Sequence, residues 1–147
     1  MLKFVQKLFG SKNEKDVKFL LPIVDQINEE YEKLASLSDE ELQAKTAEFR
    51  ARIKEATGEI EDEMTQLRED LKQDLPHEER MTIFDRLDEL QKELLEETKA
   101  TLDDLLPEAF AVVKDACRRH VGKEWLVAGQ KQKWEMVPYD VQLIGGI

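Results

Sequence analysis

The amino-acid sequence predicts a mainly α-helical fold, built from amphipathic helices with an inserted antiparallel αα-hairpin and a short β segment at the C-terminal end. Charged residues make up 37% of the 147-residue chain and aromatic residues only 7%, which is typical of long exposed helices. Apolar residues recur every three or four positions over most of the chain, the period of an amphipathic helix. After Gly122 this period gives way to β-branched and aromatic residues.

Composition excludes several classes of protein. The net charge of −11 argues against general binding of nucleic acid by the whole chain. Cys117 is the only cysteine, so no internal disulfide can form and a reducing cytosol is expected. No apolar run approaches the roughly 18 residues that span a bilayer, and the N-terminus lacks the pattern of a signal peptide. We therefore expect a soluble protein whose contact with membranes is peripheral.

Residues 1–10 predict a short basic amphipathic helix that ends at Gly10. Its bulky apolar face is bordered by lysines, and such a helix can lie in the interface of an anionic membrane. The alternative is that the helix docks on its own protein or on a second copy. The candidate contact residues in and just after this segment are Lys3, Phe4, Lys7, Leu8, Phe9, Lys12 and Lys15.

Residues 11–56 predict two further helices whose apolar stripes face a core. A Ser-x-x-Glu capping box opens each of them, the first at Ser11 and the second at Ser38. We expect Pro22 to bend or split the first helix, because proline removes a helical hydrogen bond. We expect Gly58 to end the second helix.

Residues 57–104 predict the inserted hairpin. Apolar residues recur at helical spacing on both sides of a break at Pro76. Two amphipathic helices joined by a short turn form an antiparallel αα-hairpin, and their narrow apolar stripes suit a two-stranded seam. The other faces are almost all charged or amide residues, which is typical of solvated helices. An alternative is a partner-binding arm with an apolar tip at Met81, Ile83 and Phe84.

Residues 105–122 predict another helix, which begins near Pro107 and ends at Gly122. Proline is favourable in the first turn of a helix, where its missing N–H has no helical partner in any case. The apolar stripe of this helix is expected to face inward, with Arg118 and Arg119 facing out.

Residues 123–147 predict the β segment. Residues 125–129 and 133–137 have the composition of two short strands, joined as a hairpin around Gly129 and Gln130. The apolar run from 141 to 144 predicts the first strand of a parallel sheet whose other strands are absent.

The sequence predicts no catalytic residue and no metal site. His77 and His120 are the only histidines, and neither has a second histidine or cysteine at a spacing that suits a metal. Carboxylates are so frequent that chance pairs occur on every charged helix face, so none is assigned to acid–base chemistry.

Gln142 is the one side chain that suggests a ligand. It is a lone amide between apolar residues, and its planar group can both donate and accept hydrogen bonds. An adenine edge, which shows a donor beside an acceptor, suits such a group. The alternative is that Gln142 caps a turn and that Gly145 and Gly146 merely end a strand.

A resemblance to the SecA family of ATP-driven protein-export motors supports the first interpretation. The segment Tyr139-Asp-Val-Gln-Leu-Ile-Gly-Gly146 resembles the one that precedes the phosphate-binding loop in that family. Further blocks resemble the family in the same order along the chain, and the stretch from about 56 to 102, which shorter members lack, lies between the last two. The blocks are Met1-Leu-Lys-Phe4 with Leu8-Phe-Gly-Ser11, Leu37-Ser-Asp-Glu-Glu-Leu42 with Lys45-Thr-Ala-Glu-Phe-Arg50, and Leu106-Pro-Glu-Ala-Phe-Ala111.

The resemblance implies that Gln142 reads adenine and that Met136 and Tyr139 wall it. It also implies ATP or ADP with Mg²⁺ in the intact protein. The family's G-x-x-x-x-G-K-[ST]-type loop follows shortly after this segment, and the chain ends at Ile147 before reaching it. We therefore expect the chain to be the N-terminal part of a motor that neither holds a nucleotide cofactor nor hydrolyses ATP alone.

The implied partners are a SecY-type translocation channel, preproteins, an anionic phospholipid surface and the ribosome, with a homodimer possible. The implied location is the cytoplasm, at the inner face of the plasma membrane. The alternative from another class is a non-catalytic helical adaptor or dimerisation module, with the hairpin as its seam.

Overall fold

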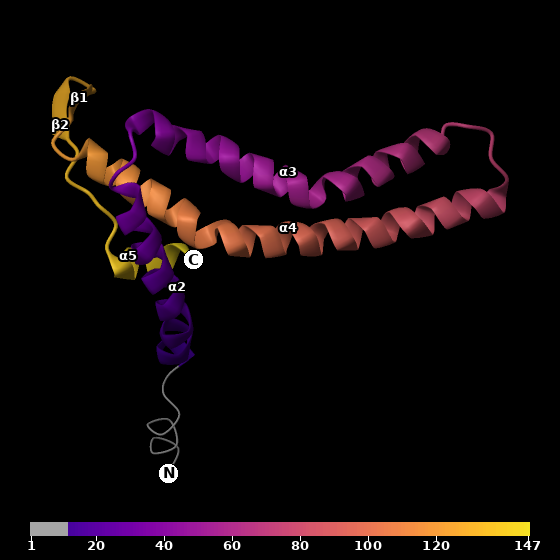
Figure 1. Ribbon diagram of the computed structural model, residues 1–147, viewed down its shortest axis with the longest axis horizontal. Helices are drawn as coiled ribbons and strands as arrows, with labels where there is room; N and C mark the ends of the chain where they lie inside the picture. The colour runs from indigo at the N-terminus through magenta and orange to yellow at the C-terminus, as the bar shows by residue number, and fades with distance from the viewer. Residues whose placement is uncertain (1–11) are drawn as a thin grey trace, which may run out of the picture. The chain divides into compact units, whose positions relative to one another are not determined.

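The computed structural model describes residues 12–147, so the expectations for residues 1–11, including those for Lys3, Phe4, Lys7, Leu8 and Phe9, lie outside the described residues. The mainly helical class, with a two-stranded antiparallel sheet near the C-terminal end, is confirmed (Figure 1). The elements are α2 (Lys12–Leu34), α3 (Asp39–Asp70), α4 (His77–His120), β1 (Glu124–Val127), β2 (Gln130–Lys133) and α5 (Asp140–Gly146). Within the described part, no helix has the length and apolar character needed to cross a membrane.

The predicted helix end at Gly58 and the predicted helix start near Pro107 are wrong, and Pro22 does not split its helix. Pro22 lies inside α2, Gly58 inside α3 and Pro107 inside α4. Glycine in a helix interior costs about 1 kcal/mol and proline about 3 kcal/mol relative to alanine. Burial of neighbouring side chains offsets these costs, and Thr57, beside Gly58, is 2% exposed and donates its hydroxyl to the carbonyl of Ile53 at 3.0 Å.

The described residues form two compact units. One unit contains the described residues up to Leu42 together with Leu106–Ile147, and the other is Gln43–Leu105. The second unit contains the predicted antiparallel αα-hairpin, whose helices are joined by the turn at residues 71–76 (Figure 1). Its first helix is part of α3 and begins before residue 57, and its second helix is part of α4 and continues beyond residue 104. Its fully buried residues are few, as a narrow seam requires: Thr57, Met64, Leu90 and Leu105.

Arg86 joins the two helices of the hairpin. Its Nε and Nη2 donate to the two carboxylate oxygens of Glu63 at 2.8 and 3.1 Å, a bidentate geometry that favours the ionised pair. Its Nη1 donates to Glu93 at 3.0 Å, and more weakly to Glu89 at 3.4 Å. The hydrogen bond from Arg86 holds the pKa of Glu63 below its ordinary value.

We expect Glu63→Gln to lower the Tm of the hairpin at pH 7 by about 2 °C. The glutamine amide is neutral and has one oxygen, so it cannot accept both hydrogen bonds from Arg86 as the carboxylate does. A carboxylate with a lowered folded pKa stabilises the fold above its ordinary pKa of about 4.3, and this contribution disappears as pH falls through the folded pKa. The Tm difference between wild type and variant should therefore vanish in calorimetric scans carried from pH 7 down to pH 2. Glu89→Gln is the matched control, and an equal, pH-independent loss there would contradict the assignment.

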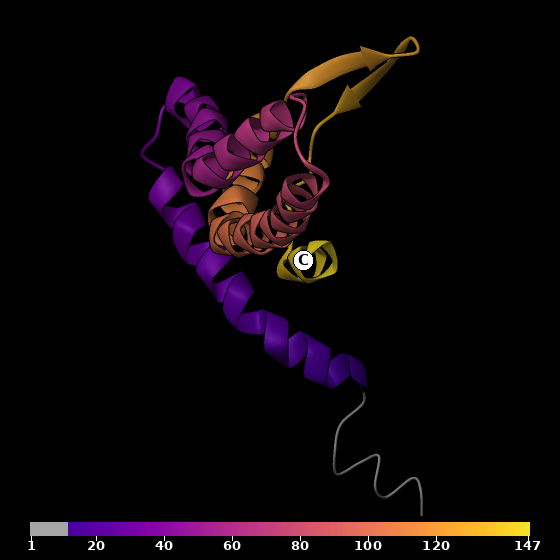
Figure 2. The same cartoon turned by 90° about the vertical axis from the view of Figure 1, so that its right-hand side faces the viewer.

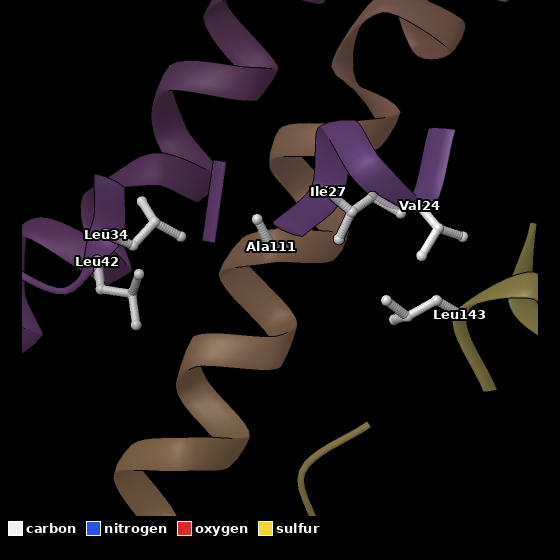
Figure 3. Packing of buried hydrophobic residues seen from close by; sticks show 6 residues of the cluster. All are labelled: Val24, Ile27, Leu34, Leu42, Ala111 and Leu143. Carbon is white, nitrogen blue, oxygen red and sulfur yellow. The ribbon is translucent and has the colours of Figure 1, made fainter. Parts of the chain in front are cut away.

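The first unit has a core that draws on four helices. Val24, Ile27 and Leu34 come from α2 and pack with Ala111 of α4 (Figure 3). Leu42, at the start of α3, and Leu143 of α5 complete the buried cluster. Because α5 places a buried leucine against α2, the C-terminal segment is fixed to the helical scaffold.

Arg119 closes the end of α2, contrary to the prediction that it faces out. Its side chain is 14% exposed, and its Nη2 donates to the carbonyls of Leu34 and Leu37 at 3.2 and 2.7 Å. Its Nη1 donates to Asp39 and its Nε to the fully buried Asp115, each at 2.7 Å. Carbonyls at a helix C-terminus lack helical donors and favour a cation. Arg119 also holds the pKa of Asp39 below its ordinary value, chiefly through their hydrogen bond.

The predicted hairpin of strands is confirmed, but the second strand is earlier than expected, at residues 130–133 (Figure 2). The turn consists of Ala128 and Gly129, which both have positive φ, so the strands pair from Glu124↔Lys133 to Val127↔Gln130. The strand predicted over 141–144 is wrong, because this run belongs to the short helix α5.

Candidate functional site

Gln142 helps to start α5. Tyr139 precedes the helix in an extended conformation, and its N–H donates to Gln142 Oε1 at 2.9 Å. The N–H groups of Gln142 and Leu143 donate to the Tyr139 carbonyl at 2.8 and 3.0 Å. The interpretation of Gln142 as a cap is therefore correct for this segment. The cap uses one lone pair of Oε1, which leaves the second lone pair and the carboxamide nitrogen as an acceptor and a donor for a ligand.

A pocket of about 280 Å³ lies beside this helix. This volume is near the lower end of the range for small-molecule sites, roughly 300 to 1,000 Å³. Its lining is apolar except for one side-chain amide: Phe110, Val113, Met136, Pro138, Gln142 and Leu143. The structure thus brings Gln142 and Met136 together, whereas Tyr139 is 75% exposed and is not among the lining residues.

Gly146 brings the end of α5 close to the pocket wall. A Cβ atom at this position would lie 3.1 Å from Cε1 of Phe110, which is tighter than ordinary packing. A Cβ at Gly145 would meet nothing within 4 Å. The second glycine of the pair therefore permits a close approach, which the sequence interpretation as a simple strand end did not anticipate.

Trp134 contacts the backbone of Met136, which lines the pocket. Its Nε1 donates to the Met136 carbonyl at 2.7 Å, and its ring meets Trp125 edge-on at a centroid distance of 6.2 Å. Trp125 in turn stacks on His120 at 6.1 Å. These aromatic residues connect the hairpin of strands to the end of α4 and orient Met136. The sequence predicted strands for the two tryptophans and a helix for His120, but not these contacts.

Three polar side chains that sequence analysis did not single out meet where α2, α4 and α5 converge. Lys114 Nζ donates to Asn28 Oδ1 at 2.6 Å and lies 3.7 Å from Asp140 Oδ1. Asn28 Nδ2 donates to Asp140 Oδ1 at 3.2 Å. One signal for this junction was present in the sequence, because Asn28 interrupts the apolar stripe of Val24, Ile27 and Tyr31.

Among residues 12–147, no cluster of three or more histidine, cysteine, aspartate or glutamate side chains could hold a metal ion.

The family described as the SecA DEAD-like domain matches residues 5–147. The chain belongs to the SecA DEAD-like domain family. The protein translocase subunit SecA of Chloroherpeton thalassium is 49% identical over 148 residues, and that of Salinibacter ruber is 42% identical over 167 residues. SecA of Chlorobaculum tepidum is 45% identical over 148 residues. Each comparison covers 100% of this chain and 14% of the relative, so the chain spans about 14% of the length of these curated SecA relatives.

No solved structure matches this chain. The alignments with the SecA relatives run through the hairpin, including residues 57–104. The segment that was expected to be an insertion therefore has a counterpart in these relatives.

Proposed function

We propose that this chain is the N-terminal part of a SecA-type ATP-driven motor that moves preproteins across the bacterial cytoplasmic membrane. In this proposal its C-terminal segment supplies the adenine side of the nucleotide site. The observation that carries the proposal is the pocket in which the Gln142 amide meets the apolar walls formed by Met136 and Phe110. Membership of the SecA family gives this pocket its expected ligand.

The chemistry of the pocket suits an adenine ring. Apolar side chains such as Met136 and Pro138 can cover the faces of the base, and a single amide fixes its orientation. The Gln142 nitrogen would donate to one adenine ring nitrogen while its oxygen accepts from the exocyclic amine. Tyr139, with its ring exposed, would join only at the edge of such a site.

The remaining parts of a nucleotide site would come from other residues. The sequence contains no G-x-x-x-x-G-K-[ST] loop, so the phosphates of ATP or ADP and their Mg²⁺ would be held elsewhere in the whole protein. We accordingly expect no ATP hydrolysis by this chain alone. The proposed partners are the SecY-type channel, preproteins, anionic phospholipid, the ribosome and a second copy of the chain. The proposed location is peripheral, on the cytoplasmic side of the membrane.

A chimera tests the proposed function. Because the relatives align with the whole chain, residues 1–147 can replace the matching segment of Chloroherpeton thalassium SecA. The chimera should support ATP-dependent transport of a preprotein into membrane vesicles. In this chimera, Gln142→Ala should raise the KM for ATP about tenfold, because the amide that orients the base is removed. A tenfold change corresponds to a loss of roughly 1.4 kcal/mol of binding free energy.

Gln132→Ala, on the exposed strand β2, is the matched control and should leave the KM unchanged. A folded chimera that hydrolyses ATP normally with Gln142→Ala would contradict the adenine site. A folded chimera that transports no preprotein would favour the adaptor interpretation of this chain.

A further inference from the structure

A polar junction joins α2, α4 and α5 and is not part of the proposed adenine site. It consists of Asn28, Lys114 and Asp140, one residue from each helix. Lys114 is the central member. Its side chain is 12% exposed, and its ammonium lies 5.1 Å from the centroid of the Tyr31 ring, within reach of a cation–π interaction.

A largely buried ammonium requires partners, because removing it from water is costly unless its charge is matched. Asn28 satisfies one of its donors directly at 2.6 Å, and Asp140 supplies the nearby negative charge. Asn28 is at the same time a donor to Asp140, so its amide bridges the cation and the anion. The three groups therefore form one hydrogen-bonded unit in which each member fixes the position of the next.

The unit acts on α5 at its first residue. A helix of seven residues is too short to be stable in isolation, so its orientation depends on what it contacts. Leu143 provides one anchor, which is apolar and buried at 4% exposure. Asp140 provides the other, one turn earlier on the same helix. Two anchors one turn apart restrict rotation of α5 about its axis, and this rotation determines whether Gln142 faces the pocket.

We propose that Asn28 and Lys114 are positioning residues, which hold Asp140 and through it orient α5 so that Gln142 faces the pocket. The biological meaning of this inference rests on the proposed adenine site. In this proposal α2 supports the pocket through Asn28, which contacts Asp140 of α5 and is not itself a lining residue. By thermodynamic linkage, a ligand that orders α5 also strengthens its contact with α2.

A double-mutant cycle in the 147-residue chain tests the inference by amide hydrogen exchange of Leu143 and Ile147. Their N–H groups donate to the carbonyls of Tyr139 and Leu143 at the two ends of α5. Asn28→Asp sets a second carboxylate against Asp140 and should speed this exchange about tenfold, whereas Asp140→Asn should speed it about threefold. The double variant should return to within about twofold of wild type, because the new amide at position 140 can donate to the new carboxylate at position 28, which still accepts from Lys114. Asp25→Asn, an exposed change on α2, is the control.

A second readout separates positioning from general packing. Adenosine is titrated into each variant while the carboxamide signals of Gln142 are followed by nuclear magnetic resonance. Affinity for adenosine should fall about fivefold in Asn28→Asp and recover in the double variant. Exchange at Met64 and Leu90, in the other compact unit, should not change.

The outcomes are distinct. Additive effects without recovery in the double variant would overturn the inference. Unchanged adenosine affinity in the presence of faster α5 exchange would also overturn it, by showing a merely structural contact. If adenosine leaves the wild-type Gln142 signals unmoved while the exchange cycle shows recovery, the adenine site fails and the positioning of α5 by Asn28 and Lys114 stands.

Discussion

Replacing Ile27 by alanine is expected to lower the free energy of unfolding of the first unit by about 3 kcal/mol, within the range of 2 to 5 found for such truncations. Ile27 is 0% exposed and lies at the centre of the cluster that joins α2 to Ala111 and Leu143 (Figure 3). Truncation removes buried methyl groups and leaves a cavity that rigid helices cannot close. Urea unfolding followed by circular dichroism measures the loss.

Phe19→Ala is the matched control for this prediction. Phe19 is in the same helix but is 75% exposed, so its truncation should change the unfolding free energy by less than about 0.5 kcal/mol, although it removes a larger side chain. Equal losses for Phe19→Ala and Ile27→Ala would show that helix propensity, not burial, determines the stability of α2.

The second large effect is expected for Arg119→Ala, which should lower the Tm by about 5 °C or more. The substitution removes one of the two arginines that pair with the fully buried Asp115, and it removes the Arg119 donor from the carbonyls of Leu34 and Leu37. Asp115 keeps Arg118 on Oδ1 but loses the donor to Oδ2, and removing a partner of a buried charge costs more than removing a partner of a solvated one. Scanning calorimetry measures the Tm. Nuclear magnetic resonance should show the pKa of Asp39 rising toward its ordinary value, because the hydrogen bond from Arg119 that chiefly lowers it is lost.

Arg118→Ala separates the two arginines. Arg118 also pairs with Asp115, but its side chain is 43% exposed and bonds no helix end among the described contacts. Its loss should lower the Tm by no more than about 2 °C. Arg119→Lys should recover only part of the loss, because an ammonium cannot reproduce the fork that reaches two carbonyls and two carboxylates. Full recovery by lysine would contradict the role given to this geometry.

Local signals in the sequence predicted local structure well. The capping box at Ser38 forms as expected, with the Glu41 N–H donating to Ser38 Oγ at 3.2 Å and the Ser38 N–H donating to Glu41 Oε2 at 2.7 Å. The break at Pro76 and the hairpin of strands also depend on neighbouring residues only. Such features could be predicted because the groups that decide them are a few residues apart.

Features decided by distant partners could not be predicted. Pro22 and Pro107 stay inside helices near residues that pack in the core with distant parts of the sequence, Val24 and Leu106 respectively. The run from 141 to 144 has the composition of a strand, yet Leu143 is buried against α2 and the segment is helical. In the same way, Arg119 was expected to face solvent, because its partners Leu34 and Leu37 precede it by more than 80 positions.

The candidate site was predictable only where a residue type has a characteristic chemistry. Gln142 stood out as a lone amide, and the family resemblance added Met136, which shares its pocket. The contacts of Asn28 and Lys114 could not be predicted, because both are residue types common on protein surfaces and their partners lie on other helices.

The aromatic contacts beside the pocket have an optical consequence. The chain has only two tryptophans, Trp125 in β1 and Trp134 directly after β2, and Trp134 donates to the Met136 carbonyl. The intrinsic fluorescence of the chain therefore arises entirely from the unit that contains the pocket, while the αα-hairpin at Gln43–Leu105 is silent at tryptophan wavelengths. Tryptophan emission therefore reports the unfolding of this unit separately from the unfolding of the αα-hairpin.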